Sequence, residues 1–365
     1  MRKLILPPTA AVICYALMIL PSLVGQAAYA QTPTTPFPLG TIQPASPSAN
    51  CPDGYTCSGV QVTCPQVANS LRGTLAVAAH TQGNPRGLIM LFTGGPGSEW
   101  WTSQAPEVPA LADELRAQGF TIVQAKWSNS WHDTAAGNDA GTARLGCRPA
   151  TVIRYVYDNY YLPLGVTPAR IGQANFCITG NSGGASQVSY ALSHYGLENI
   201  LNVVIPTGGP PHSALAKSMM NNPVEEGYWY PLGTRRTIDR SFGFLDGNGP
   251  GARQDPTFIP RWLEESISTG GSDYNHPRTR VHFIIGEQDQ GMQTVSSDYS
   301  LRLRNEGSPF VTVEIAPGTP HSVIETAAGR AALKAAILTN RNPPQFDFDG
   351  DGKADISMFR PTDGI

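Results

Sequence analysis

Residues Cys177-Ile178-Thr179-Gly180-Asn181-Ser182-Gly183-Gly184-Ala185 join an apolar, strand-like run to a helix-compatible segment, 185–195. Within them, the pattern Gly-x-Ser-x-Gly predicts a very tight turn with Ser182 at its apex, in a strained backbone conformation. The hydroxyl would then lie exposed at the N-terminus of a helix, where backbone N–H groups favour negative charge. We therefore interpret Ser182 as a candidate nucleophile. The competing interpretation is an ordinary loop rich in glycine and serine.

An acid and a base follow later strands of the chain. Residues 280–285 have the composition of a buried strand and lead to Asp289, and residues 310–315 have that of another strand and lead to His321. Ser182, Asp289 and His321 thus occur in the order nucleophile, acid, base.

Three other residues compete for roles at this site. Glu287 is an alternative to Asp289 as the acid, and His212 could line the site. His282 lies in the middle of a predicted strand, so we interpret it as a core residue.

A glycine-rich loop precedes the serine motif. The strand-like run 87–92 leads into Thr93-Gly94-Gly95-Pro96-Gly97. This loop resembles the HGGPG loop of α/β-hydrolases, with Thr93 where that family usually has histidine. Together with the order of the three candidate residues, it makes the chain similar to the α/β-hydrolase superfamily over roughly 59–340. The resemblance is to esterase- and lipase-like serine hydrolases, and it implies that the N–H groups of Gly95 and Gly183 form an oxyanion hole.

Strand-like and helix-like segments alternate along the chain, which predicts an α/β fold with a mostly parallel central sheet flanked by helices. We expect strands at 59–63, 72–80, 87–92, 120–125, 201–206, 280–285 and 310–315, besides the run before Ser182, and helices at 105–118, 150–160, 185–195, 295–304 and 322–339.

The hydrolase-like domain is expected to span 51–342. Segment 207–279 interrupts the alternation of strand-like and helix-like segments. We interpret it either as a cap over the site or as a loop excursion packed on the core. Four tryptophans follow two strand ends and could line an aromatic cleft or simply pack: Trp100, Trp101, Trp127 and Trp131.

The N-terminal 30 residues have the features of a signal peptide. Met1-Arg2-Lys3 precedes an apolar run, and Ala28-Tyr29-Ala30 provides a small-x-small cleavage site. Segment 31–50 is rich in Pro, Thr and Ser, which predicts a flexible linker. With a net charge of −3, the chain is not expected to bind nucleic acid or an anionic membrane. We therefore expect an exported protein, extracellular or periplasmic, without a stable membrane anchor.

Five cysteines remain after removal of a signal peptide, so at most two internal disulfides form. The cluster Cys51, Cys57 and Cys64 predicts a local bridge. Cys147 and Cys177 are a candidate pair for the second, although the spacing leaves the pairing open.

The composition changes again in the tail, 343–365. Four aspartates alternate with glycine and other residues, namely Asp347, Asp349, Asp351 and Asp355. Carboxylates at this spacing suit calcium, and the segment resembles one unit of an FG-GAP-type calcium-binding repeat. A single unit cannot bury its own face. A structural calcium ion and a solvated acidic tail are both open interpretations.

The sequence therefore predicts a secreted serine hydrolase that cleaves a carboxylic ester, which could be polymeric, through an acyl-enzyme and without a cofactor for catalysis. A serine peptidase or amidase of the same fold is the first alternative. A non-catalytic extracellular binding protein on a hydrolase scaffold is the second.

Overall fold

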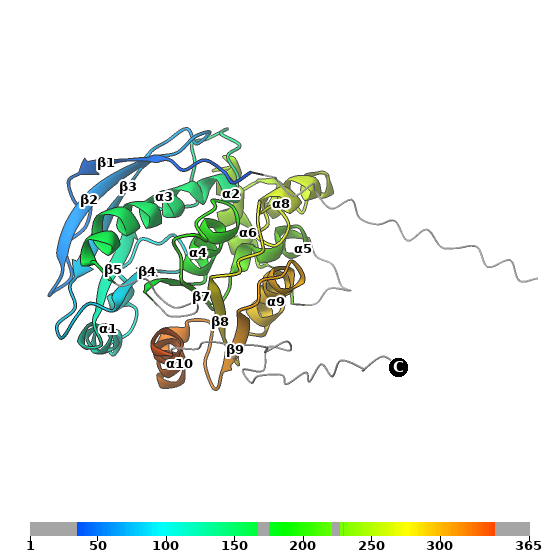
Figure 1. The fold of residues 1–365 in the computed structure, drawn as a ribbon. Helices are drawn as coiled ribbons and strands as arrows, with labels where there is room; N and C mark the ends of the chain where they lie inside the picture. The colour runs from blue at the N-terminus through cyan, green and yellow to red at the C-terminus, as the bar shows by residue number, and fades with distance from the viewer. Residues whose placement is uncertain (1–34, 167–174, 221–226, 229, 340–365) are drawn as a thin grey trace, which may run out of the picture.

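The computed structural model describes residues 35–166, 175–220, 227–228 and 230–339. A nine-stranded sheet with the order β1-β2-β3-β5-β4-β6-β7-β8-β9 runs through its centre (Figure 1). The strands are β1 (Thr41–Ala45), β2 (Thr56–Thr63), β3 (Leu71–Ala78), β4 (Gly87–Phe92), β5 (Phe120–Trp127), β6 (Phe176–Asn181), β7 (Val203–Thr207), β8 (Arg280–Gly286) and β9 (Val311–Ala316).

The sheet is antiparallel at one end and parallel over the rest. Strands β1, β2, β3 and β5 pair antiparallel, whereas β5, β4, β6, β7, β8 and β9 form a parallel array. Every residue of β4, β6 and β8 is buried, as expected for parallel strands that are covered on both faces. The predicted α/β-hydrolase fold is confirmed.

Helices cover both faces of the sheet (Figure 1). The main helices are α1 (Val108–Ala117), α3 (Cys147–Val156), α4 (Gly183–Ser193), α9 (Gln290–Asn305) and α10 (Ala327–Leu338). One large apolar cluster contains buried side chains of α3, α4 and α9, and a second contains those of α1 and α10. The two clusters are the two layers of core on either side of the sheet.

Two boundaries differ from the sequence-based prediction. Residues 41–45 lie in the predicted linker, but the structure shows that they form β1. Each of these five residues pairs with a residue of β2. The last helix begins at Ala327 rather than near 322, because the Thr326 side chain accepts a hydrogen bond from Gly329 N and caps the first turn.

The described part of segment 207–279 contains four short α-helices and a small core of its own. The helices are α5 (Leu215–Met219), α6 (Leu232–Asp239), α7 (Pro250–Arg253) and α8 (Ile259–Glu265). Leu215, Phe242 and Trp262 pack together with Val295 of α9. The segment is therefore a helical insertion that packs against the main domain through α9.

Two disulfides are present among the described residues, Cys51–Cys57 and Cys64–Cys147. The expected local bridge is confirmed, but the candidate pair Cys147–Cys177 is wrong. Cys177 is a buried free thiol and belongs to the cluster that contains α1 and α10, whereas Cys147 belongs to the opposite cluster. The sheet separates the two sulfur atoms. Burial raises the pKa of the Cys177 thiol to about 12.

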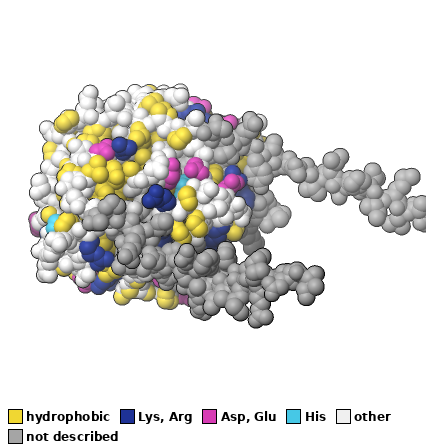
Figure 2. Space-filling model, in the orientation of Figure 1, with side chains coloured by type: hydrophobic (Ala, Val, Ile, Leu, Met, Phe, Trp, Pro, Cys, Tyr) yellow, Lys and Arg dark blue, Asp and Glu magenta, His cyan; other side chains and the backbone are white. Residues whose placement is uncertain are grey.

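On the described part of the face seen in Figure 2, acidic and basic side chains are interspersed with apolar ones. Among the described residues, no helix has the length and apolar character needed to span a bilayer.

Candidate active site

The sheet topology brings the candidate residues to one edge. Gly95 follows β4, Ser182 follows β6, Asp289 follows β8 and His321 follows β9, and these strands are parallel. The carboxyl ends of parallel strands meet at the same edge of a sheet, which is where open α/β sheets bind ligands. Residues far apart in the chain thus converge there.

The backbone of Ser182 is strained. Its φ of 54° and ψ of −116° lie outside the regions that L-residues favour. The conformation is held by a hydrogen bond from Ser182 N to Thr207 O, at 2.9 Å, and by helix α4, which starts at the next residue. The Ser182 side chain is half-buried, so a tight turn presents it at the N-terminus of α4.

Asp289 and His321 form a direct pair. His321 Nδ1 donates to Asp289 Oδ2 at 2.7 Å. The aspartate side chain is 13% exposed, whereas the histidine side chain is 48% exposed. The alternative acid, Glu287, instead accepts a hydrogen bond from Gly318 N at 2.7 Å. Its carboxylate therefore supports the loop before His321 but does not contact the imidazole through a hydrogen bond.

Asn181 links the serine turn to the histidine loop, a role that the sequence did not suggest. Its Oδ1 accepts from Thr207 Oγ1 at 3.1 Å and from Val323 N at 3.2 Å. Gly208 allows this approach, because a Cβ at that position would lie 2.3 Å from His321 O. No hydrogen bond joins Ser182 Oγ to His321 Nε2 in the described part of the chain. Catalytic hydrogen bonds commonly tighten only with substrate in place.

The loop after β4 lies against the serine turn. A Cβ on Gly183 would meet Gly95 O at 2.5 Å and Gly95 N at 3.0 Å, so only glycine permits this contact. The N–H groups of Gly95 and Gly183 have no protein acceptor among the described residues. They are two neighbouring donors beside Ser182. Thr93, which replaces the usual histidine, donates to Glu99 O and closes the loop upon itself.

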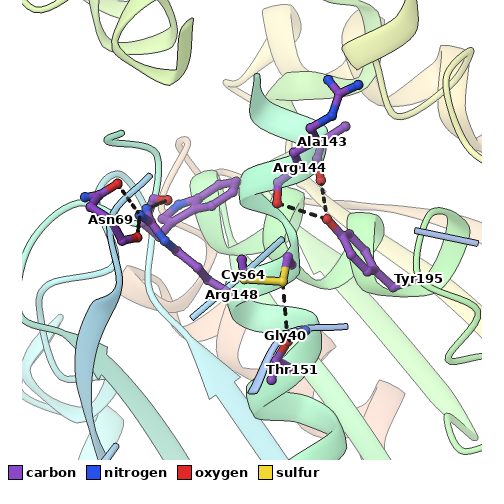
Figure 3. Close-up of a disulfide and its surroundings, with 10 residues drawn as sticks. Gly40, Cys64, Asn69, Ala143, Arg144, Arg148, Thr151 and Tyr195 are labelled. Atoms are coloured by element: carbon purple, nitrogen blue, oxygen red, sulfur yellow. Dashed lines mark hydrogen bonds between the residues drawn. A yellow bond between two sulfur atoms is a disulfide. The ribbon is translucent and has the colours of Figure 1, made fainter. Parts of the chain in front are cut away.

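Trp131 holds the Gly95 loop. Its backbone N–H donates to Pro96 O at 3.1 Å, and its indole Nε1 donates to Gly95 O at 3.2 Å. Arg148, fully buried, donates to Trp131 O at 2.7 Å. Figure 3 shows Arg148 directed toward Asn69, beside the disulfide at Cys64. Neither Arg148 nor Trp131 belongs to a motif, so no local pattern could have identified this support.

The four tryptophans do not form one cleft. Trp101 and Trp131 are core residues of opposite clusters. Trp100 and Trp127 contribute to the wall of a surface pocket of about 570 Å³ that also contains Ser98. Trp127 Nε1 donates to Gln187 Oε1 at 2.8 Å and its backbone N–H donates to Gly97 O at 2.9 Å, so this residue contacts both α4 and the glycine loop.

The remaining histidine candidates lie outside the Asp289–His321 pair. His212 is buried with its ring centroid 5.6 Å from that of Trp131 and 5.2 Å from that of His132. Burial lowers the pKa values of both histidines, that of His132 to about 3. His282 contacts Thr312 and Glu314 on the neighbouring strand. The four aspartates of the tail lie outside the described residues.

Comparison with known proteins gives only structural similarity. No protein-family model matches the sequence, and no curated protein matches it. A thermostable carboxylesterase from a metagenomic library is 14% identical with a TM-score of 0.47, over 80% of this chain and 89% of the other. A carboxyl esterase of Tuber melanosporum is 13% identical with a TM-score of 0.48, over 78% and 86%. Prolyl oligopeptidase B of Galerina marginata is 11% identical with a TM-score of 0.47, over 78% and 37%. At these scores and identities, the similarities do not assign a function.

Proposed function

We propose that the protein is a serine hydrolase that cleaves carboxylic esters, with Ser182 as nucleophile, His321 as general base and Asp289 as the acid that orients it. The observation that carries the proposal is the 2.7 Å hydrogen bond from His321 Nδ1 to Asp289 Oδ2. This pair lies at the same sheet edge as the strained, half-buried Ser182 and the N–H groups of Gly95 and Gly183, which have no acceptor within the part of the chain that the structure describes.

Each group has one role in the reaction. Ser182 Oγ attacks the ester carbonyl while His321 Nε2 takes its proton, and Asp289 stabilises the resulting imidazolium. The oxyanion accepts hydrogen bonds from Gly95 N and Gly183 N, a contribution of roughly 3 kcal/mol for each donor in known cases. His321 then protonates the departing alcohol, and water hydrolyses the acyl-enzyme by the reverse sequence of proton transfers.

We propose ester cleavage rather than amide cleavage as the activity, although the same groups could catalyse both. A peptidase must protonate a poor amine leaving group and hold an extended peptide. A non-catalytic binding protein would not require the strain at Ser182, which a fold tolerates at a cost of about 1–3 kcal/mol.

The test is labelling with a fluorophosphonate probe, followed by mapping of the labelled peptide. We expect the label on Ser182, its loss in Ser182→Ala and its loss in His321→Ala. Ser98→Ala is the matched control, because Ser98 is also half-buried and directly follows the glycine-rich loop 93–97. Hydrolysis of p-nitrophenyl esters but not of aminoacyl-anilides would support an esterase. Folded Ser182→Ala protein with normal turnover would refute the mechanism.

We also propose that the protein is exported and cleaved after Ala30. The two disulfides are compatible with an oxidising compartment. Expression of the full chain in a secreting host should give extracellular or periplasmic protein whose N-terminal residue is Gln31 by mass spectrometry. Retention of residues 1–30 in the mature protein would contradict this.

A further inference from the structure

Three potential metal ligands lie together at a distance from the candidate active site. One ligand atom each from Glu198, Asp273 and His276 lies within 4.8 Å of the other two. Glu198 belongs to the connection between α4 and β7, and the other two belong to the connection between α8 and β8. The cluster therefore joins two loops that are about 75 residues apart in the chain.

His276, the buried member of this cluster, has one ring nitrogen without a hydrogen-bond partner. Its side chain is fully buried, and Nδ1 has no hydrogen-bond partner. The other nitrogen, Nε2, lies 3.3 Å from Ser193 Oγ. An Nε2–H donated to Ser193 would leave the Nδ1 lone pair free, as in metal sites whose histidine is oriented by its second nitrogen.

The two carboxylates also lack a compensating charge. Glu198 Oε2 is buried without a hydrogen-bond partner. Neither Glu198 nor Asp273 forms an ion pair with a Lys or Arg within the described ranges. A buried polar atom without a partner is destabilising, and a cation would satisfy all three groups together.

We propose that Glu198, Asp273 and His276 bind a divalent transition-metal ion, with Zn²⁺ as the best fit. One imidazole and two carboxylates form a mixed nitrogen and oxygen donor set that suits Zn²⁺ better than the all-oxygen shells of calcium and magnesium. Water would complete a four-coordinate shell. Glu198 also lines a surface pocket of about 290 Å³.

The position assigns the ion a structural role. The two loops precede β7 and β8, so the cluster lies at the amino ends of parallel strands. The candidate catalytic residues lie at the carboxyl ends of the same sheet. The ion would therefore stabilise the fold by joining the loops, and this inference does not depend on the proposed hydrolase activity.

The experiment measures zinc binding by the full-length, chelator-treated and dialysed protein, using equilibrium dialysis with metal analysis. We expect one tightly bound Zn²⁺ per chain. Glu198→Gln and His276→Gln should weaken binding by at least about tenfold, the lower range seen when only an outer partner of a metal ligand is removed. Zinc should raise the Tm of the unmodified protein by binding the native state, and should raise that of Glu198→Gln much less.

Three controls make the outcome decisive. Glu314→Gln alters another carboxylate beside a histidine, His282, and should bind zinc normally. Asp289→Asn tests whether zinc binds instead at His321, and a chain ending at 342 tests the tail aspartates. Undiminished binding by Glu198→Gln, whose side chain is half-exposed and whose fold is checked by circular dichroism, would overturn the proposal. Loss of binding in Asp289→Asn or in the shortened chain would also overturn it.

Discussion

Asp289 and Glu287 differ by only two positions, yet the structure gives them different partners. Asp289 accepts from His321, and Glu287 accepts from Gly318 N. Asp289→Asn should lower kcat by on the order of 10³–10⁴-fold, because an amide favours the wrong imidazole tautomer. Glu287→Gln, which keeps an oxygen acceptor, should lower it by less than about tenfold. Steady-state kinetics on an ester that the protein cleaves would compare the pair. The reverse ranking would identify Glu287 as the acid.

Trp131 acts on the site through Gly95. Trp131→Phe removes the indole donor to Gly95 O but keeps most of the buried apolar surface. We expect kcat to fall by about tenfold while KM changes little, because an oxyanion donor contributes mainly in the transition state. Trp101→Phe is the matched control. That tryptophan is equally buried but belongs to the opposite cluster, so its replacement should affect Tm rather than kcat. A shift of KM alone in Trp131→Phe would exclude a positioning role.

At the scale of elements, the two disulfides should contribute different amounts to the free energy of unfolding. Cys64–Cys147 joins the residue after β2 to the first residue of α3 across 83 positions, whereas Cys51–Cys57 spans 6 positions. A chain-entropy estimate gives about 4.5 kcal/mol for the long loop and about 2 kcal/mol for the short one. Double replacement of each pair by serine, followed by urea unfolding, would measure the two losses. Equal losses of unfolding free energy would show that Cys64–Cys147 does not stabilise the protein chiefly by restricting the unfolded chain.

Glu265, the last residue of α8, ties the insertion to the main domain. Its buried carboxylate contacts Arg261 at 2.6 Å and Arg144 at 3.3 Å, and accepts from Ala143 N. Burial outweighs the attraction of the arginines and raises the pKa of Glu265 from 4.5 to about 7. The folded protein therefore holds a proton that the unfolded chain releases between these values.

The contribution of Glu265 to stability should accordingly fall as pH rises from about 4.5 to about 7, by at most about 3 kcal/mol. Glu265→Gln cannot titrate, so the free energy of unfolding of this variant should decline less over that interval. Urea unfolding of both proteins at several pH values would test the difference. A steeper decline in the variant would show that the ionised carboxylate is the stabilising form.

At the scale of the whole molecule, removal of the tail would test whether the functional domain ends at 342, as the sequence predicts. We propose that residues 343–365 bind calcium through Asp347, Asp349, Asp351 and Asp355 without affecting catalysis. A chain ending at 342 should keep its ester turnover and lose little stability, because termini outside a core tolerate removal. Calorimetry should detect calcium binding only in the full chain. Loss of turnover on truncation would make the tail a part of the site.

Local patterns were sufficient for the fold class and most elements. Buried parallel strands require continuous apolar runs, and the serine motif requires a strand, a turn and a helix, so both are visible in short windows. Short stretches of sequence did not predict an element whose conformation depends on a partner far along the chain. Strand β1 exists because β2 offers its edge, and its own composition favours a linker.

The sequence alone determined which residue types were available for the site and their order along the chain. Only the tertiary structure decided that Asp289 rather than Glu287 pairs with His321, that Cys64 rather than Cys177 bridges Cys147, and that Trp131 holds Gly95. It also brought Glu198 to His276. The physical reason is common to all four. Strand order and the two faces of the sheet set which side chains meet, and neither is encoded in local spacing.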